Sequence, residues 1–236
     1  MTDTFLSCDW GTSQFRLRLV DGPNCEVLGE FRSTEGVGRL AAASLGSDRT
    51  EHFRRALTAG VSTFEKQLSN RPSDCPVVVS GMASSSIGWA ELPYSTLPFK
   101  LDGSDLVWQD VGPLQVCKSS HRVILLSGVR AEWEMMRGEE TQLLGLTRLS
   151  AGHALSEEAV VILPGTHSKH VHVKGGYIID LHTYMTGELF EVLGRHSVLQ
   201  HSVSTSGLGD SQACCREGLT RSGFVAGVQA VRSTAR

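Results

Sequence analysis

Two short turns, each rich in glycine and hydroxyl residues, are the segments of this sequence best suited to bind phosphate. The first turn is Asp9-Trp10-Gly11-Thr12-Ser13 and the second is Gly165-Thr166-His167-Ser168. Glycine lets backbone N–H groups approach a polyphosphate closely, and the neighbouring hydroxyls supply further donors. The carboxylate of Asp9 could hold Mg²⁺ through water, because Mg²⁺ prefers oxygen ligands. For the first turn alone, an ordinary hairpin in which Asp9 caps its own backbone explains the residues equally well.

The pair of turns is more informative than either turn alone. Neither is a Walker A loop, since the second glycine and the strand-to-helix context are missing. Each Gly-Thr turn lies between two expected strands, so we expect the two to face each other across a cleft and clamp the β- and γ-phosphates of ATP. Arg16, just after the first turn, is most simply a solvated residue, although it lies close enough to contact phosphate. The pair favours phosphoryl transfer to a small polar substrate.

A third segment could supply the carboxylate that such a reaction needs. Phosphoryl transfer to a hydroxyl requires a group that accepts the proton and orients the attack. Glu139 and Glu140, in the stretch Arg137–Gly145, stand at the expected start of a helix, and either could serve. The alternative is an acidic first turn that interacts favourably with the helix dipole.

The loop Gly81–Trp89 is a candidate pocket floor. It follows the apolar run Pro76–Ser80, which is typical of a parallel strand covered on both faces. Its small residues suit a site where ligand and backbone approach closely. Trp89 is either a wall of that pocket or a core residue.

Hydrophobic periodicity places these segments on an α/β framework that opens with an antiparallel meander. Helical spacing predicts helices over Thr50–Leu68, Arg130–Leu149 (interrupted near Gly138) and Thr186–Leu193. The expected strands are Phe5–Cys8, Phe15–Val20, Cys25–Phe31, Pro76–Ser80, Arg122–Leu126, Val160–Pro164, Lys169–Val173 and Tyr177–Tyr184. The order of strands and turns in the first thirty residues reappears after Val160. We therefore expect two domains of similar plan, residues 1–130 and 131–236.

Composition argues against several other classes of protein. Hydrophobic residues make up 40% of the 236 residues, charged residues 20%, and the formal net charge is −3. These values suit a globular enzyme and give no electrostatic case for binding nucleic acid or an anionic membrane. No apolar run approaches the roughly 20 residues of a membrane helix, and the N-terminus lacks a signal-like stretch. We expect a cytoplasmic protein whose six cysteines are reduced thiols.

Five stretches, in order, resemble the 2-dehydro-3-deoxygalactonokinase family, in the sugar-kinase branch of the actin, hsp70 and hexokinase superfamily. They span nearly the whole chain and are DWGTSQFRLRLVD, GMASSSIGWAELPY, RGEETQLLG, LPGTHSKHV and MTGELFEVL. The resemblance implies an actin-like ATPase (ribonuclease H-like) fold, with two similar domains around a cleft. It also implies phosphorylation of the 6-hydroxyl of 2-dehydro-3-deoxy-D-galactonate by MgATP, in galactonate breakdown.

The resemblance also implies roles for individual residues. The stretch from Gly138 is similar to the Gly-Asp-Gln segment that carries the catalytic base in related sugar kinases, which points to Glu139, a glutamate in place of their aspartate. Lys169 or Arg137 could meet the substrate carboxylate. Two sets of residues resemble the family's two phosphate motifs: Asp9, Gly11, Thr12 and Ser13 for the first, and Gly165, Thr166, His167 and Ser168 for the second. The family's sugar-acid loop is resembled by Ser84, Ser85, Ser86, Gly88 and Trp89.

The family's C-terminal part has no counterpart in this sequence. The family continues with helices and a Gly-rich adenosine-binding segment, for which no motif is visible before Arg236. We therefore expect an incomplete second domain, and a relative that binds the sugar acid without transferring phosphate is a second hypothesis. A homodimer would cover the sheet edge that a shortened domain exposes.

A metal-dependent hydrolase is the alternative from another class of enzyme. If a hairpin turn centres on Gly175, then His170, His172, Asp180 and His182 share one face of a sheet. Imidazoles and a carboxylate on one surface could hold Zn²⁺ with one position open to water. No HExxH or Cys/His finger spacing supports this hypothesis.

Overall fold

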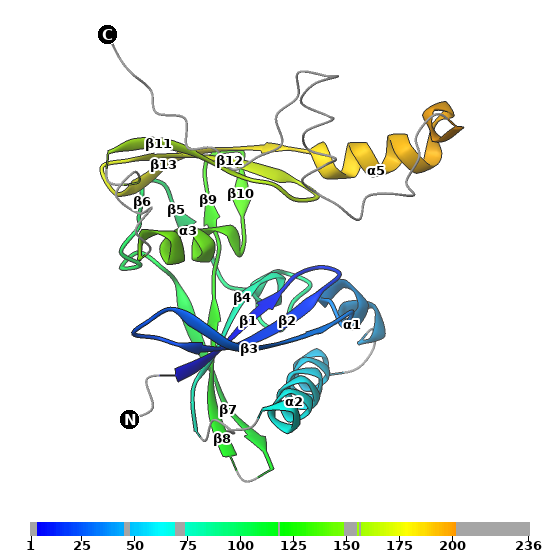
Figure 1. Cartoon of the computed structure of the whole chain (residues 1–236), viewed down its shortest axis with the longest axis vertical. Coiled ribbons are helices and arrows are strands. Elements are labelled where there is room, and N and C mark those ends of the chain that lie inside the picture. The colour runs from blue at the N-terminus through cyan, green and yellow to red at the C-terminus, as the bar shows by residue number, and fades with distance from the viewer. Residues whose placement is uncertain are drawn as a thin grey trace. The chain divides into compact units, whose positions relative to one another are not determined.

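The structure, a computed structural model, describes residues 4–44, 48–68, 74–117, 119–148, 155 and 157–201. The chain divides into two compact units, residues 1–150 and 151–236 (Figure 1). The expected boundary near residue 130 falls inside the first unit. The segment around it belongs there because Val129–Arg130 pair with Ser95–Thr96, and because Arg137 hydrogen-bonds Ser84.

A six-stranded sheet forms the centre of the first unit. Its strands are β1 (Thr4–Trp10), β2 (Phe15–Asp21), β3 (Glu26–Ser33), β4 (Val77–Gly81), β7 (Trp108–Val116) and β8 (Ser119–Leu126). The spatial order is β3-β2-β1-β4-β8-β7. β1 to β3 form the predicted antiparallel meander, and β4 lies parallel to both β1 and β8, as its fully apolar sequence predicted. β7 was not predicted, because only Leu114 and Val116 on it are buried.

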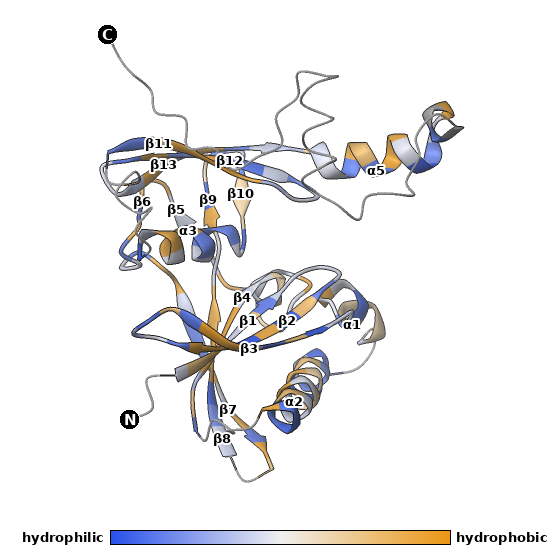
Figure 2. Ribbon diagram, viewed as in Figure 1, coloured by the Kyte–Doolittle hydropathy of each residue, from blue (hydrophilic) through white to orange (hydrophobic). Residues whose placement is uncertain are grey.

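Helix α2 (Arg49–Gln67) provides the apolar face that packs on this sheet. Asp48 caps its first turn by accepting a hydrogen bond from the Glu51 N–H at 3.3 Å. The predicted helical spacing is confirmed, since the buried residues include Phe53, Leu57, Val61 and Phe64. The strands are largely hydrophobic where they cross the core (Figure 2). A shorter helix, α1 (Val37–Ala43), leads from β3 towards α2.

Trp10 connects the first turn to this core. Its ring centroid lies 5.0 Å from that of Phe15, in an edge-on arrangement, and 5.3 Å from that of Phe53. Such aromatic contacts add to the free energy gained by burial. The strand end that carries the turn is therefore held by both the sheet and α2.

A buried polar cluster ties α2 to β8. The Nδ1–H of His121 donates to the Cys75 carbonyl oxygen at 2.8 Å, and its Nε2 lies 3.2 Å from a carboxyl oxygen of Glu65. The side chains of His121 and Glu65 are 0% and 4% exposed. Each therefore depends on the other, because a buried polar group without a partner destabilises the folded state.

Replacing Glu65 with alanine should lower the free energy of unfolding by about 2–4 kcal/mol, because the buried His121 ring loses its partner. Urea unfolding followed by tryptophan fluorescence measures the change. Glu91→Ala, which removes an exposed glutamate, is the matched control. A loss no larger than that of the control would show that the cluster contributes nothing beyond ordinary side-chain contacts.

The helix predicted over Arg130–Leu149, interrupted near Gly138, is confirmed after Gly138 and wrong before it. Two short strands, β9 (Val129–Arg130) and β10 (Met135–Met136), and a shorter helix, α3 (Glu139–Thr147), occupy this stretch. β9 also pairs with another two-residue strand, β5 (Ser95–Thr96). Gly138 has φ +112°, which ends any helical path before α3. Met135 is exposed and Met136 buried, as in a strand. The 3₁₀ turn η1 (Met82–Ser84) and strand β6 (Phe99–Lys100) also belong to the first unit.

The second unit repeats the plan of the opening meander. Its elements are β11 (Glu158–Leu163), β12 (Ser168–Lys174), β13 (Tyr177–Tyr184), α5 (Thr186–His196) and η3 (Val198–His201). β12 pairs antiparallel with both β11 and β13. All three strands and α5 were predicted, with α5 extending beyond the expected end at Leu193. The order of strand, turn, strand, strand and helix matches that of β1 to β3 and α1.

Among the described residues, none of the helices combines the length and apolar character needed to cross a bilayer. Cys8, Cys25, Cys75 and Cys117 are free thiols. Cys214 and Cys215 lie outside the described residues.

Candidate functional site

The first Gly-Thr turn joins β1 to β2 and directs its carbonyl groups into the protein. The Gly38 N–H, at the start of α1, donates to the Thr12 carbonyl oxygen at 3.0 Å. A Cβ at Gly36 would lie 2.3 Å from the same oxygen, so only glycine lets the chain approach the turn this closely. Thr12 and Ser13 are exposed, and their hydroxyls make no hydrogen bond within the described part of the chain. The outward donors of the turn are therefore left for an anion.

Asp9 and Arg16 lie directly opposite each other at the base of this turn. A guanidinium nitrogen of Arg16 is 3.2 Å from Oδ2 of Asp9, and the two side chains are 31% and 41% exposed. Oδ1 of Asp9 has no partner among the residues that the structure describes. Nε of Arg16 is buried and has no hydrogen-bond acceptor among the described residues, which is unfavourable for the folded state.

The second Gly-Thr turn, between β11 and β12, is built in the same way. The Glu188 N–H, in the first turn of α5, donates to the Thr166 carbonyl oxygen at 3.0 Å. A Cβ at Gly187 would lie 2.5 Å from the Gly165 carbonyl oxygen. In each unit, a glycine next to the start of the following helix lets that segment pack against the turn.

The side chains after Gly165 and Thr166 are already engaged within the second unit. His167 Nε2 lies 2.5 Å from a carboxylate oxygen of Glu188. Ser168 is buried and its hydroxyl bonds that of Thr186. Of the predicted residues of this turn, Gly165 and Thr166 are the ones that remain exposed without such a side-chain contact.

Three of the predicted segments meet at Gly81 within the first unit. The register of β1 with β4 places Asp9 beside Ser80 and Trp10 beside Gly81. A Cβ at Gly81 would lie 2.8 Å from the Trp10 carbonyl oxygen, and a Cβ at Gly138 would lie 3.3 Å from the Gly81 Cα. The first turn, the loop after β4 and the start of α3 therefore converge at one end of the sheet.

The two glutamates at the start of α3 have different environments. Glu140 is 0% exposed, and its carboxyl oxygens accept from the Gly138 N–H at 2.8 and 2.9 Å. Burial raises the pKa of Glu140 to about 8. Glu139 is half-buried, its Oε2 accepts from the Arg137 N–H at 3.0 Å, and its Oε1 has no partner among the described residues. A general base must come within hydrogen-bond reach of the proton that it accepts. The carboxyl of Glu140 is enclosed and faces the Gly138 N–H, so the half-buried Glu139 is the better suited of the two.

Several residues of the loop Gly81–Trp89 hold the loop itself. The Ser84 hydroxyl donates to the Leu126 carbonyl oxygen at 2.6 Å, and the Ser85 hydroxyl donates to the Met82 carbonyl oxygen at 2.7 Å. Both serines are buried. Their hydroxyls fix the loop backbone and do not point to solvent.

The remaining loop residues divide between core and surface. Trp89 is 4% exposed and belongs to the core, which is the second of the two roles considered for it. A Cβ at Gly88 would lie 2.3 Å from the Ala83 carbonyl oxygen, so glycine closes the loop. Ser86 is exposed, and Arg49 donates to its carbonyl oxygen at 2.8 Å.

Arg137 ties this loop to the start of α3. One guanidinium nitrogen donates to the Ser84 carbonyl oxygen at 2.5 Å and to the Ser84 hydroxyl at 2.7 Å. Nε donates to the Tyr94 hydroxyl at 3.3 Å, and the guanidinium lies 4.0 Å from the centroid of the Tyr94 ring. Sequence reasoning considered Arg137 only as a ligand for the substrate carboxylate and missed this contact. Lys169, the other candidate, donates to the Thr183 hydroxyl at 2.8 Å.

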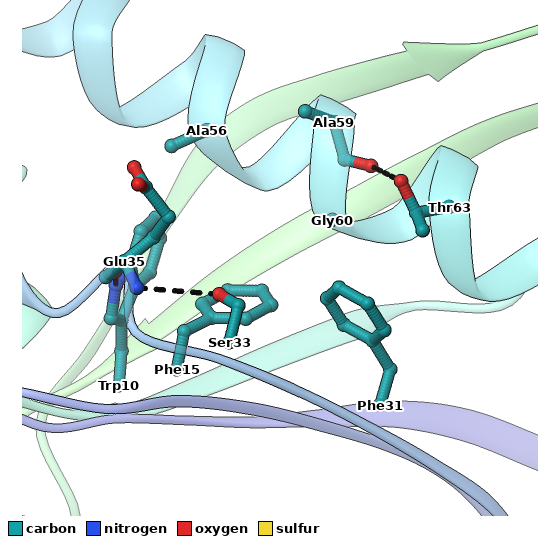
Figure 3. A pocket seen from close by; sticks show the side chains of 9 residues that line it. All are labelled: Trp10, Phe15, Phe31, Ser33, Glu35, Ala56, Ala59, Gly60 and Thr63. Carbon is teal, nitrogen blue, oxygen red and sulfur yellow. Dashed lines mark hydrogen bonds between the residues drawn. The ribbon is translucent and has the colours of Figure 1, made fainter.

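A mostly apolar cavity of about 190 Å³ lies on the opposite face of the sheet from Asp9 (Figure 3). Successive residues of a strand point to opposite faces, which sends the Trp10 ring to this side. The Trp10 ring N–H donates to the Glu35 carbonyl oxygen at 2.8 Å. The lining residues are Trp10, Phe15, Phe31, Ser33, Glu35, Ala56, Ala59, Gly60 and Thr63, which include none of the predicted site residues.

Comparison with known proteins decides the family. The model of a family described as 2-keto-3-deoxy-galactonokinase matches residues 9–235. This chain belongs to that family. The predicted family resemblance is thereby confirmed, and all five stretches that carried it lie within the matched residues.

Individual relatives of this 2-keto-3-deoxy-galactonokinase family member cover most of its chain. A Rhizobium meliloti (strain 1021) protein named as a probable 2-dehydro-3-deoxygalactonokinase is 33% identical over 204 residues, which cover 85% of this chain and 59% of the relative. The 2-dehydro-3-deoxygalactonokinase of Escherichia coli (strain K12) is 31% identical over 203 residues, covering 84% and 59%. The chain thus spans about three-fifths of the length of these two relatives.

A solved structure supports the same fold. A crystal structure assigned to a 2-dehydro-3-deoxygalactonokinase protein from Sinorhizobium meliloti matches with a TM-score of 0.61 and 29% sequence identity, over 94% of this chain and 75% of that one. Together with the meander and helix repeated in both units, this match confirms the predicted actin-like ATPase fold.

The donors of this 2-keto-3-deoxy-galactonokinase family member fit a nucleotide with its magnesium ion. Thr12 and Ser13 offer exposed hydroxyls, and Asp9 offers one carboxylate oxygen to a hydrated cation. Mg²⁺ keeps several waters and needs few direct protein ligands, so a single carboxylate is a suitable holder.

The predicted histidine face is present in the second unit. His170 lies opposite His182 and His172 lies opposite Asp180, as a turn at Gly175 required. Two of these imidazoles pair with carboxylates: His172 with Glu158 at 3.0 Å, and His182 with Asp180 at 3.2 Å. Within the described ranges, no group of three or more His, Cys, Asp or Glu side chains is arranged to hold a metal ion.

Proposed function

We propose that this protein phosphorylates the 6-hydroxyl of 2-dehydro-3-deoxy-D-galactonate with MgATP, in galactonate breakdown in the cytoplasm. The names of the family and of its relatives support a sugar-acid kinase. The observation that carries the proposal is the convergence at Gly81 of the first Gly-Thr turn, a loop of small residues and the start of α3, which bears Glu139. Phosphoryl transfer depends mainly on bringing such groups together in a fixed geometry.

Each chain segment has a separate task in this mechanism. The outward donors of Thr12 and Ser13 bind phosphate, and Gly165 and Thr166 form the second phosphate turn. Asp9 would hold Mg²⁺ through water, and the ion, when bound, neutralises charge on the phosphates. Glu139 accepts the proton of the 6-hydroxyl on its free Oε1, while the Arg137 N–H holds its Oε2 in place. Glu140, buried and hydrogen-bonded to the Gly138 N–H, fixes the start of α3.

The replacement Asp9→Ala should lower phosphorylation of the sugar acid by about 10- to 100-fold, because the carboxylate that orients the hydrated cation is lost. A coupled assay of ADP release with 2-dehydro-3-deoxygalactonate and Mg²⁺ measures the rate, and ³¹P NMR locates the new phosphate ester. Asp21→Ala, at the far end of β2, is the control.

The same assay separates the kinase from a binding-only relative. A folded wild-type chain that binds the sugar acid, yet releases no ADP, would overturn the kinase proposal. Sedimentation equilibrium of the same preparation tests the homodimer that we propose for this chain.

A further inference from the structure

The small sheet of β5, β9 and β10 has two clearly different faces. Register places Ser95 beside Val129 and Val129 opposite Met136, and all three residues are buried. On the other face, Thr96 lies beside Arg130, and Arg130 lies opposite Met135. Thr96, Arg130 and Met135 are all exposed. We call this second side the outer face of the small sheet.

Tyr94 and Arg137 extend the outer face towards the candidate site. Tyr94 stands two residues before Thr96, and Arg137 two residues after Met135, so each continues the alternation on the same side. The Tyr94 hydroxyl lies 3.5 Å from the Met135 sulfur, and the Arg137 guanidinium stacks on the Tyr94 ring. Through Arg137 the outer face adjoins the Ser84 loop and the backbone N–H that holds Glu139.

The two arginines on this face differ in how many of their hydrogen-bond donors are free. The Arg137 guanidinium donates hydrogen bonds to Ser84, Leu92 and Tyr94, within the protein. The Arg130 side chain is exposed and makes no hydrogen bond or ion pair with any residue that the structure describes. Diagonal neighbours on a sheet lie roughly 7–8 Å apart, which puts Arg130 within one sugar-acid length of the Arg137 position.

We propose that Arg130 binds the carboxylate of the sugar acid, at the end of the substrate opposite the hydroxyl that reacts near Glu139. This inference rests on the proposed function and adds to it the residue that selects an acid over a neutral sugar. A guanidinium presents paired donors that match the two oxygens of a carboxylate, and Arg130 is the arginine of the outer face with those donors free. Arg137 acts instead as a positioning residue, which holds the loop and the base in register.

The test measures affinity and not turnover. Isothermal titration of the full chain uses 2-dehydro-3-deoxygalactonate as the acid and its methyl ester as the uncharged probe. Arg130→Gln should raise the Kd of the acid by about 10- to 100-fold, as expected when charge-assisted hydrogen bonds are lost. The Kd of the ester should stay within about twofold of its wild-type value, because the uncharged ester forms no charge-assisted hydrogen bond with Arg130 in the wild-type chain. Arg55→Gln removes another exposed arginine of the first unit and should leave both values unchanged.

The outcomes separate this inference from the function on which it rests. Equal affinity of wild type and Arg130→Gln for the acid would overturn the role of Arg130 and leave the proposed kinase intact. A wild-type chain that binds neither acid nor ester would overturn the proposed function, and the inference with it. Parallel weakening of acid and ester in Arg130→Gln would also overturn the inference, since it would report damage to the site and not the loss of a charge contact.

Discussion

Replacing Glu139 with glutamine should lower kcat for phosphorylation of the sugar acid by about 10²- to 10⁴-fold, with KM changed only a few-fold. Glutamine keeps an oxygen that can accept from the Arg137 N–H, so the start of α3 should retain its geometry. What is lost is the basic oxygen that takes the proton of the attacking hydroxyl. Steady-state assays at saturating MgATP, with the sugar acid varied, separate the two parameters.

Two further variants define the role of Glu139. Glu139→Asp retains a carboxylate and should keep part of the activity, limited by the missing methylene. Glu132→Gln alters an exposed glutamate in the hairpin between β9 and β10 and should behave as wild type. If Glu139→Gln kept full kcat while Glu140→Gln lost it, the base would be Glu140 despite its burial.

The elements that the sequence predicted correctly are those in which the periodic pattern is long. The buried stripe Phe53, Leu57, Val61 and Phe64 repeats over several turns, so α2 was predicted close to its observed bounds. Alternation along β2 likewise predicted one buried face, and the apolar run of β4 predicted a strand with parallel neighbours, although β4 also alternates between buried and half-buried residues. The two Gly-Thr turns were identified from residue types that suit phosphate, although a Cβ at Gly11 or at Gly165 would make only ordinary contacts.

The short strands were missed because a strand of two residues is too short to show an alternating hydrophobic pattern. β5, β9 and β10 are each two residues long, and their alternation becomes visible only when the strands are aligned with one another. The segment that contains Arg130 and Met136 therefore looked helical. This same segment supplies the outer face of the small sheet, so the feature that carries our further inference could not have been derived from local patterns.

The roles of adjacent residues also depend on tertiary packing. Consecutive residues of a helix point about 100° apart, so one of two neighbouring glutamates can enter the core while the other stays at the surface. Residue types alone allowed either Glu139 or Glu140, the family resemblance pointed to Glu139, and of the two Glu140 is the one that is fully buried. Likewise, Ser84 looked like a substrate ligand by its type, but its hydroxyl bonds Leu126 on a distant strand.

In the wild-type chain we expect the free energy of unfolding to decrease as the pH rises from about 4.5 to about 8, and replacing Glu140 with glutamine should remove this decrease. Burial raises the pKa of Glu140 from 4.5 to about 8 in the folded chain. Between these values the folded chain binds one more proton than the unfolded chain. The free energy of unfolding therefore decreases as pH rises, by about 1.4 kcal/mol per pH unit, and by a total on the order of 4 kcal/mol. The contribution is complete below about pH 4.5 and lost above about pH 8.

Urea unfolding of wild type and Glu140→Gln across this range, followed by fluorescence of the buried Trp10 and Trp89, measures the difference. The variant should match wild type near pH 4.5 and become progressively more stable than wild type towards pH 8, because its amide carries no charge into the core. Glu91→Gln, an exposed glutamate, should follow the wild-type curve. Curves for wild type and Glu140→Gln that stay parallel would mean that Glu140 is ionised in the folded chain.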